Sequence, residues 1–302
     1  MYIGAYLGRR TTYSPDKLAI IDVGKQPALE LTYRQMNERA NRLANWLRDV
    51  ACVQKGDRVA ILARDGVEHL DLFYACGKLG AIHTPFNWRL HWRELAGLIA
   101  QTRPKAVVFS EEFKEAVARI KAELSIGNWE LGIVNGGADS GESLTIDNSQ
   151  FPIDNFLHLN GDGLPFSRDY LSTLDQSTNL PVTCESLEAE DIACLLFTGG
   201  TTGLAKGAMI SHRMICWNVM NTVIHDLTHD DVYVNVFPLF HAGGLFTYLS
   251  SQVIFGNTTI LTRQFDPAQV LDLIECYRVT VFAAVPTMYQ IMTCLLYTSR
   301  CV

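Results

Sequence analysis

The chain has 302 residues, of which 48% are hydrophobic and 19% charged, and its formal net charge is −7. This length fits about two folding units, and the shortage of Lys and Arg argues against nucleic acid as the main partner. Eight cysteines without a C-x-x-C pair predict reduced thiols, not disulfides or a zinc site. No leader and no membrane span are recognisable, so we expect a cytoplasmic protein.

Apolar runs alternate with amphipathic stretches in the first part of the chain, which is typical of a parallel α/β sheet. The predicted elements, in chain order, are a helix at 31–50, a strand at 58–63, a helix around 70–77, a strand at 81–86, a helix at 91–101 and a strand at 106–110. They form a doubly wound βαβαβ unit. The stretch 127–179 accumulates Gly, Asp, Ser and Asn, which predicts a loop-rich connection.

Regular structure is expected to resume at Asp191. Asp266 and Pro267 are a helix cap and a first-turn proline, and a strand at 280–285 follows that helix. We therefore expect two doubly wound αβ lobes with mainly parallel sheets, at about 17–180 and 185–293, with interleaved chain paths. Residues 294–302 break the amphipathic period, which predicts a truncation with a non-native tail; a frayed native terminus is the alternative.

The most informative segment follows an apolar strand at 192–197. Its glycines can turn backbone N–H groups toward an anion, its threonines add hydroxyl donors, and its lysine supplies a positive charge. The candidate phosphate-binding residues are Thr198, Gly199, Gly200, Thr201, Thr202, Gly203 and Lys206. A Walker A loop runs directly into a helix, whereas an apolar stretch at 208–210 intervenes here before a helix cap at Ser211. We expect a mobile flap between two antiparallel strands; a hairpin without a ligand is the alternative.

This loop resembles the signature Y-T-S-G-(S/T)-T-G-x-P-K-G of the adenylate-forming superfamily, which includes acyl-CoA synthetases, aryl-CoA ligases, luciferases and peptide-synthetase adenylation domains. Gly199 replaces the usual serine and removes one donor, and Ala205 replaces a proline that would fix a backbone angle. Further stretches resemble the family in the same order, at 31–37, 80–90, 237–245 and 285–289. The resemblance covers about 17–292 and implies that 1–293 form an incomplete N-terminal AMP-binding domain of the acyl-adenylate-forming fold.

The resemblance also implies a pocket for the carboxylic acid, lined by Phe240, His241 and Gly243. Peptide-synthetase domains place an aspartate at the position of His241, where it pairs with an ammonium group. The lack of a carboxylate here argues against an amino acid substrate, because a buried unpaired ammonium is costly. Gly243 and Gly244 would leave room for a long apolar or aryl tail. A packed histidine satisfied by backbone is the alternative interpretation of His241.

By resemblance, the full-length parent activates a fatty acid with ATP as an acyl-adenylate and transfers it to coenzyme A, with Mg²⁺ bridging the β and γ phosphates. An aryl acid is the alternative substrate. The family's Y-G-x-T-E strand, T-G-D aspartate and late lysine are not found in this sequence, so we assign no catalytic residue and expect the chain alone to be inactive. A P-loop NTPase, with a helix starting at Lys206, and a nucleotide-binding module without catalysis are the competing classes.

Other residues receive structural interpretations. His225 and His229 have the i, i+4 spacing of a metal pair but lack a third ligand, so a solvated turn is expected. We expect His212 to lie on the surface of a first helical turn. The tryptophans Trp88, Trp92 and Trp217 are expected in the core.

Overall fold

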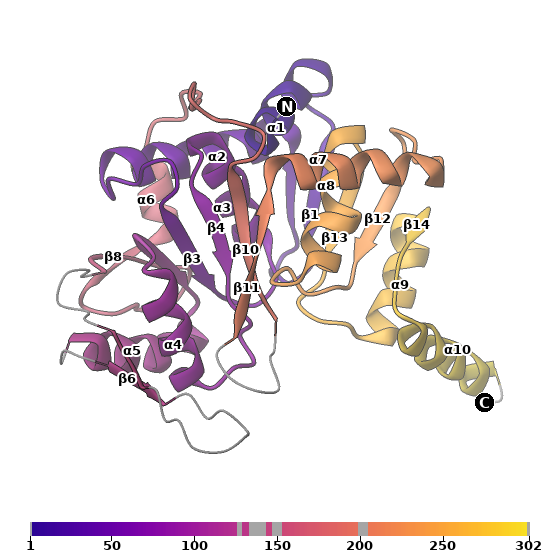
Figure 1. Cartoon of the computed structure of the whole chain (residues 1–302). Helices are drawn as coiled ribbons and strands as arrows, with labels where there is room; N and C mark the ends of the chain where they lie inside the picture. The colour runs from indigo at the N-terminus through magenta and orange to yellow at the C-terminus, as the bar shows by residue number, and fades with distance from the viewer. Residues whose placement is uncertain (1, 126–128, 133–142, 147–152, 199–204, 301–302) are drawn as a thin grey trace. The chain divides into compact units, whose positions relative to one another are not determined.

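The computed structural model of the chain describes residues 2–125, 129–132, 143–146, 153–198 and 205–300. Two compact units are present, and each draws on separate stretches of chain (Figure 1). Unit 1 comprises 1–40, 64–74 and 212–302, and unit 2 comprises 41–63 and 75–211. Both contain a mostly parallel sheet with helices, so the predicted α/β class is confirmed. The lobe boundary expected near 180–185 stays a prediction.

Unit 1 is built on a five-stranded sheet in the order β14-β12-β13-β1-β2. Its strands are β1 (Leu18–Asp22), β2 (Leu29–Thr32), β12 (Val232–Asn235), β13 (Thr258–Leu261) and β14 (Val281–Phe282). β1, β12, β13 and β14 are parallel, and β2 is antiparallel to β1. Of these strands the sequence predicted only β14, which is shorter than the expected 280–285. Because β1, β12, β13 and β14 are parallel, their carboxyl ends lie at one edge of the sheet.

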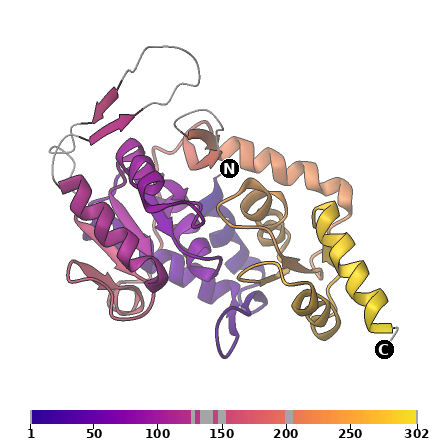
Figure 2. The same cartoon turned by 90° about the horizontal axis from the view of Figure 1, so that it is seen from below.

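The helices of unit 1 are α1 (Ile3–Tyr13), α7 (His212–Asn221), α8 (Leu249–Phe255), α9 (Pro267–Tyr277) and α10 (Pro286–Arg300). α8 packs on β13 and α9 on β12, and Figure 2 shows α7 and α8 on one side of the sheet and α9 on the other. α9 begins as predicted, because the Asp266 carboxylate accepts the Gln269 N–H (2.9 Å). α10 includes residues 294–300, and no Gly or Pro ends the helix there. The interpretation of 294–302 as a non-native tail stays a prediction.

Unit 2 is built on a seven-stranded sheet in the order β11-β10-β4-β3-β5-β8-β9, in which only β11 is antiparallel to its neighbour. Its strands are β3 (Arg58–Leu62), β4 (Ile82–Pro85), β5 (Ala106–Phe109), β8 (Asn155–His158), β9 (Ser167–Asp169), β10 (Ile192–Thr198) and β11 (Lys206–Ser211). The interpretation of 127–179 as a loop-rich connection was wrong, because β8 and β9 extend the sheet there. A separate hairpin, β6 (Trp129–Gly132) with β7 (Ser143–Ile146), also lies in this stretch.

Helices α2 (Tyr33–Asp49) and α3 (Val67–Leu79) each begin in unit 1 and end in unit 2. The remaining helices of unit 2 are α4 (Trp92–Thr102), α5 (Lys114–Ser125) and α6 (Tyr170–Gln176). α4 and α5 cover one face of the sheet, where Leu95 and Val117 pack on Ala60 and Phe109. None of the helices in the described ranges is long and apolar enough to cross a bilayer.

Candidate functional site

The phosphate-binding prediction centres on the hairpin of β10 and β11. The two strands pair antiparallel, with Thr198 opposite Lys206 and Phe197 opposite Gly207. The Thr198 hydroxyl donates to the Lys206 carbonyl oxygen (3.4 Å), and both side chains are exposed at the open end of the hairpin. A Cβ on Gly207 would lie 3.2 Å from the Phe197 ring, so glycine lets the aromatic ring cover the partner strand. The predicted strand–loop–strand arrangement is confirmed at its base.

The loop between these strands falls largely outside the described residues. Gly199, Gly200, Thr201, Thr202 and Gly203 belong to that part, so their role in phosphate binding stays a prediction. Lys206 begins a strand that runs to Ser211, and helix α7 starts only at His212. A Walker A lysine lies at the start of a helix, so this geometry contradicts the P-loop alternative.

The predicted acid pocket belongs to unit 1, at the carboxyl end of β12. We call residues 238–244 the pocket segment. The His241 N–H donates to the Pro238 carbonyl oxygen (3.1 Å), and the His241 carbonyl oxygen accepts from Gly244 and Leu245 (3.1 Å each). A π-helix, Gly243–Thr247, follows; such irregular turns are frequent at functional sites. Phe240 is buried, whereas His241 is exposed.

The hydrogen bonds of the pocket segment assign a tautomer to His241. The Gly243 N–H donates to the His241 Nδ1 atom (3.2 Å), so this ring nitrogen carries no proton. A neutral ring then holds its proton on Nε2. The exposed side chain thus presents one N–H donor, which suits a carboxylate or a phosphoryl oxygen better than it suits a cation.

Two adjacent glycines of this segment differ in what a side chain would meet. A Cβ on Gly244 would lie 2.2 Å from the Pro238 carbonyl oxygen and 2.6 Å from that of Phe237. A Cβ on Gly243 would have no atom closer than 3.6 Å, which is an ordinary contact. Gly244 is therefore required by the backbone, whereas a small side chain at Gly243 would fit without a clash.

The carboxyl edge of the unit 1 sheet also holds charged residues that the sequence did not single out. The Asp65 carboxylate accepts the Leu239 N–H (2.9 Å), and Arg263 donates from Nη1 to the Asp65 carbonyl oxygen (2.9 Å). Asp22, at the end of β1, accepts the N–H groups of Gly24 (2.9 Å) and Val67 (3.0 Å). Ligands of open α/β sheets bind at this edge, so the pocket segment lies where a substrate is expected.

Two buried carboxylates here have opposite pKa shifts. Burial raises the pKa of Asp22, although the Val67 N–H and Arg263 oppose this effect. Burial also acts to raise the pKa of Glu68, but the ion-paired Lys25 ammonium outweighs it and holds that pKa below the ordinary value. At this edge the Glu68 carboxylate is therefore favoured in its anionic form, whereas the anionic form of Asp22 is disfavoured.

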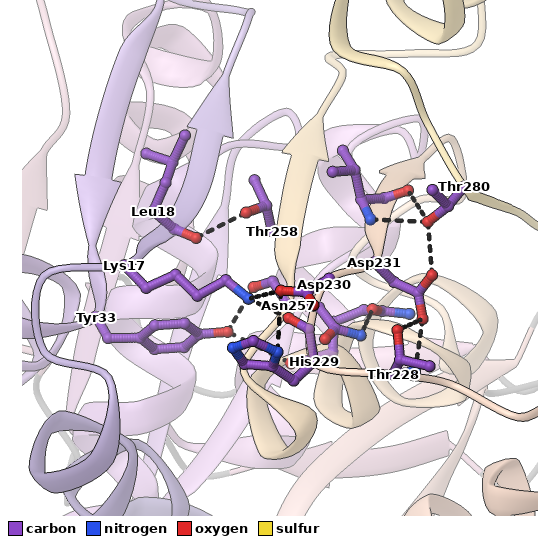
Figure 3. Close-up of polar contacts among 12 residues, drawn as sticks. Lys17, Leu18, Tyr33, Thr228, His229, Asp230, Asp231, Asn257, Thr258 and Thr280 are labelled. Carbon is purple, nitrogen blue, oxygen red and sulfur yellow. Dashed lines mark hydrogen bonds and ion pairs between the residues drawn. The ribbon is translucent and has the colours of Figure 1, made fainter.

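The histidine and tryptophan interpretations had mixed outcomes. His229 contacts Asp230 (Nδ1 to Oδ1, 2.9 Å) beside Lys17 (Figure 3), whereas His225 stacks on Tyr248 at 5.6 Å. The two rings thus have different partners, and no group of three His, Cys, Asp or Glu that could hold a metal occurs in the described ranges.

The surface position expected for His212 was wrong: its side chain is 0% exposed and packs edge-on against Tyr2 (5.9 Å), because α1 covers this turn. Trp88 and Trp92 pack partly buried against the core of unit 2, as predicted. Trp217 is 60% exposed, so its core assignment was wrong.

Comparison with known proteins places this geometry in a family context. The family model described as AMP-binding enzyme matches residues 8–299. A feruloyl-CoA synthase of Amycolatopsis is 32% identical, and the match covers 95% of this chain and 49% of that enzyme. A long-chain-fatty-acid–CoA ligase of Mycobacterium tuberculosis is 29% identical, and the match covers 96% of this chain and 51% of that enzyme. The crystal structure of ATP-bound MatB from Rhodopseudomonas palustris superposes with a TM-score of 0.76 at 28% identity, over 97% of this chain and 51% of that one. The chain spans about half the length of the curated relatives it matches.

Proposed function

Because the chain belongs to the AMP-binding enzyme family, we propose that its full-length protein activates a carboxylic acid with ATP as an acyl-adenylate and then forms a coenzyme A thioester. The relatives include ligases that act on feruloyl, indoleacetate and long-chain fatty acyl groups, according to their names. The observation that carries the proposal is the β10–β11 hairpin, whose open end exposes Thr198 and Lys206.

The hairpin is proposed to hold the β and γ phosphates of ATP. Lys206 supplies a point charge, and the Thr198 hydroxyl supplies a donor beside it. Backbone N–H groups of 199–203 would add donors to the leaving pyrophosphate. In phosphoryl and adenylyl transfer, the protein acts mainly by positioning the reactants and by neutralising this negative charge.

The pocket segment is proposed to receive the acid. His241 presents an Nε2–H donor, which can hydrogen-bond to the carboxylate or to the adenylate oxygen without itself acting as a base. The missing side chain at Gly243, where a Cβ would make only ordinary contacts, would leave the adjoining part of the acyl group access beside His241. A carboxylate at position 241 would favour an amino acid instead, so the histidine supports an acid without an ammonium group.

The acid is proposed to be a fatty acid, with an aryl acid as the second candidate. The second candidate is favoured by the feruloyl-CoA synthase relative and by the indoleacetate–CoA ligase of Aromatoleum aromaticum, which is 28% identical over 97% of this chain. When bound with ATP, Mg²⁺ would neutralise part of the charge on the phosphates. The described ranges offer no cluster of three acidic or histidine ligands for it, so the fit to a protein-held ion is not met by these residues.

ATP–pyrophosphate exchange with the full-length protein tests the proposal. Exchange should depend on added acid, and a panel of saturated fatty acids of increasing length beside ferulate and indoleacetate separates the two candidates. A matched Lys206→Ala variant should lose most of the exchange while its folding is unchanged, because Lys206 is exposed. Exchange without any added acid, or none with every acid, would rule the function out.

A further inference from the structure

A buried hydrogen bond connects the pocket segment to a distant part of unit 1. Leu239 is 0% exposed, so its N–H cannot find water and needs a protein acceptor. The Asp65 carboxylate, 5% exposed, provides that acceptor at 2.9 Å, although the two residues lie 174 positions apart in the chain. Leu239 precedes His241 by two residues, so this bond fixes the backbone position from which the His241 side chain extends.

The backbone of Asp65 is itself fixed by a hydrogen bond from Arg263. Arg263, just after β13, donates from Nη1 to the Asp65 carbonyl oxygen (2.9 Å) and from Nε to the Gly24 carbonyl oxygen (3.4 Å). The guanidinium fits because its neighbours have no side chains: a Cβ on Gly24 would lie 2.3 Å from Arg263 Nε, and one on Gly66 would lie 3.0 Å from Nη1. The loop before α3 is thus fixed to β13 and to the end of β1.

These contacts form a chain from the sheet to the exposed ring. Arg263 fixes the Asp65 backbone, the Asp65 carboxylate fixes Leu239, and the turn from Pro238 to Leu245 carries His241. We propose that Asp65 is a positioning residue for the acid pocket, which sets the placement of His241 without touching the substrate. The expected effect on kinetics rests on the proposed function, whereas the expected effect on the placement of the pocket segment does not.

The test uses the full-length protein with three variants. Asp65→Ala removes the acceptor, and Asp65→Asn keeps a side-chain oxygen that can accept the Leu239 N–H. Asp231→Ala is the matched control, because this carboxylate accepts the Thr228 N–H (2.6 Å) at the opposite edge of the same sheet (Figure 3). The readouts are amide hydrogen exchange of the pocket segment, the KM values for acid and ATP, and kcat.

Asp65→Ala should exchange the pocket-segment amides about tenfold faster, as expected for loss of one buried hydrogen bond. Its kcat/KM for the acid should fall roughly 10- to 100-fold, since small displacements of a positioning group have effects of this size, with the KM for ATP unchanged. Asp65→Asn should recover most of both properties. Asp231→Ala should alter neither, although it lowers Tm.

Equal amide exchange in Asp65→Ala and the wild type would overturn the proposal, as would an Asp231→Ala variant with the same loss of acid kcat/KM. If Asp65→Ala does not fold, Arg263→Lys replaces it, and an unchanged exchange rate there is equally decisive. A wild type without acid-dependent turnover would refute the proposed function, while the exchange data still decide whether Asp65 holds the segment.

Discussion

Replacement of Gly244 by alanine should destabilise the turn that follows β12. The added Cβ would lie 2.2 Å from the Pro238 carbonyl oxygen and 2.6 Å from that of Phe237. Both obstacles are backbone atoms, so no side-chain rotation can relieve them. Overpacking of a tight site costs about 1–3 kcal/mol, and we take about 3 kcal/mol because the backbone itself must move. For folding units of this size, Tm should fall by about 6–12 °C.

Gly243→Ala is the matched control. Its Cβ would meet the His241 Nδ1 atom at 3.6 Å and the Phe237 ring at 3.8 Å, which are ordinary contacts. Its stability should therefore change by less than about 0.5 kcal/mol. Thermal unfolding of both variants, followed by circular dichroism and repeated in urea, gives the comparison. Equal Tm values for the two variants, or a larger loss in Gly243→Ala, would refute the steric reasoning.

Three further outcomes are expected. Lys206→Ala should weaken ATP binding about tenfold in calorimetry, as expected for one charge-assisted hydrogen bond, and an unchanged Kd would contradict the role of Lys206. Because Lys25 lowers the pKa of Glu68 below the ordinary 4.5, the pair's stabilising effect is fully present above pH 4.5 and is lost as pH falls through the lower folded value. Urea titrations at stepped acidic pH should show this loss in the wild type and not in Glu68→Gln; parallel curves would disprove it. The 302-residue chain alone should give no acid-dependent pyrophosphate exchange, and robust exchange would disprove that prediction.

Local signals in the sequence were sufficient for some elements of the fold. The capped start of α9 at Asp266 and Pro267 needs no distant partner, and the hairpin from Ile192 to Ser211 is a local pairing. β8 and β9 were missed because three or four residues in a polar stretch carry no readable period. β8 is a strand because it pairs with β5, and β9 because it pairs with β8, and only the folded chain provides these partners.

The candidate site was predictable only where a motif lies in one stretch of chain. The pocket segment was found through its resemblance, but Asp65 was not, because its bond to Leu239 connects distant residues. The residue pattern of α7 likewise did not show which face of the helix packs against the rest of unit 1. α1 packs over His212, and Trp217 remains exposed, the reverse of the expectation for both residues.

The pairing of β1 with β13 has a consequence during synthesis. Ile20 reaches its partner Thr259 only after most of the chain has left the ribosome, a delay of roughly 10–50 s at cellular translation rates. Throughout that interval the β1 edge of the nascent β1–β2 ribbon has no strand partner, and apolar residues such as Ile21 are exposed. Chaperone occupancy on stalled ribosomes should therefore be highest before residue 260 emerges and should fall once β13 becomes available.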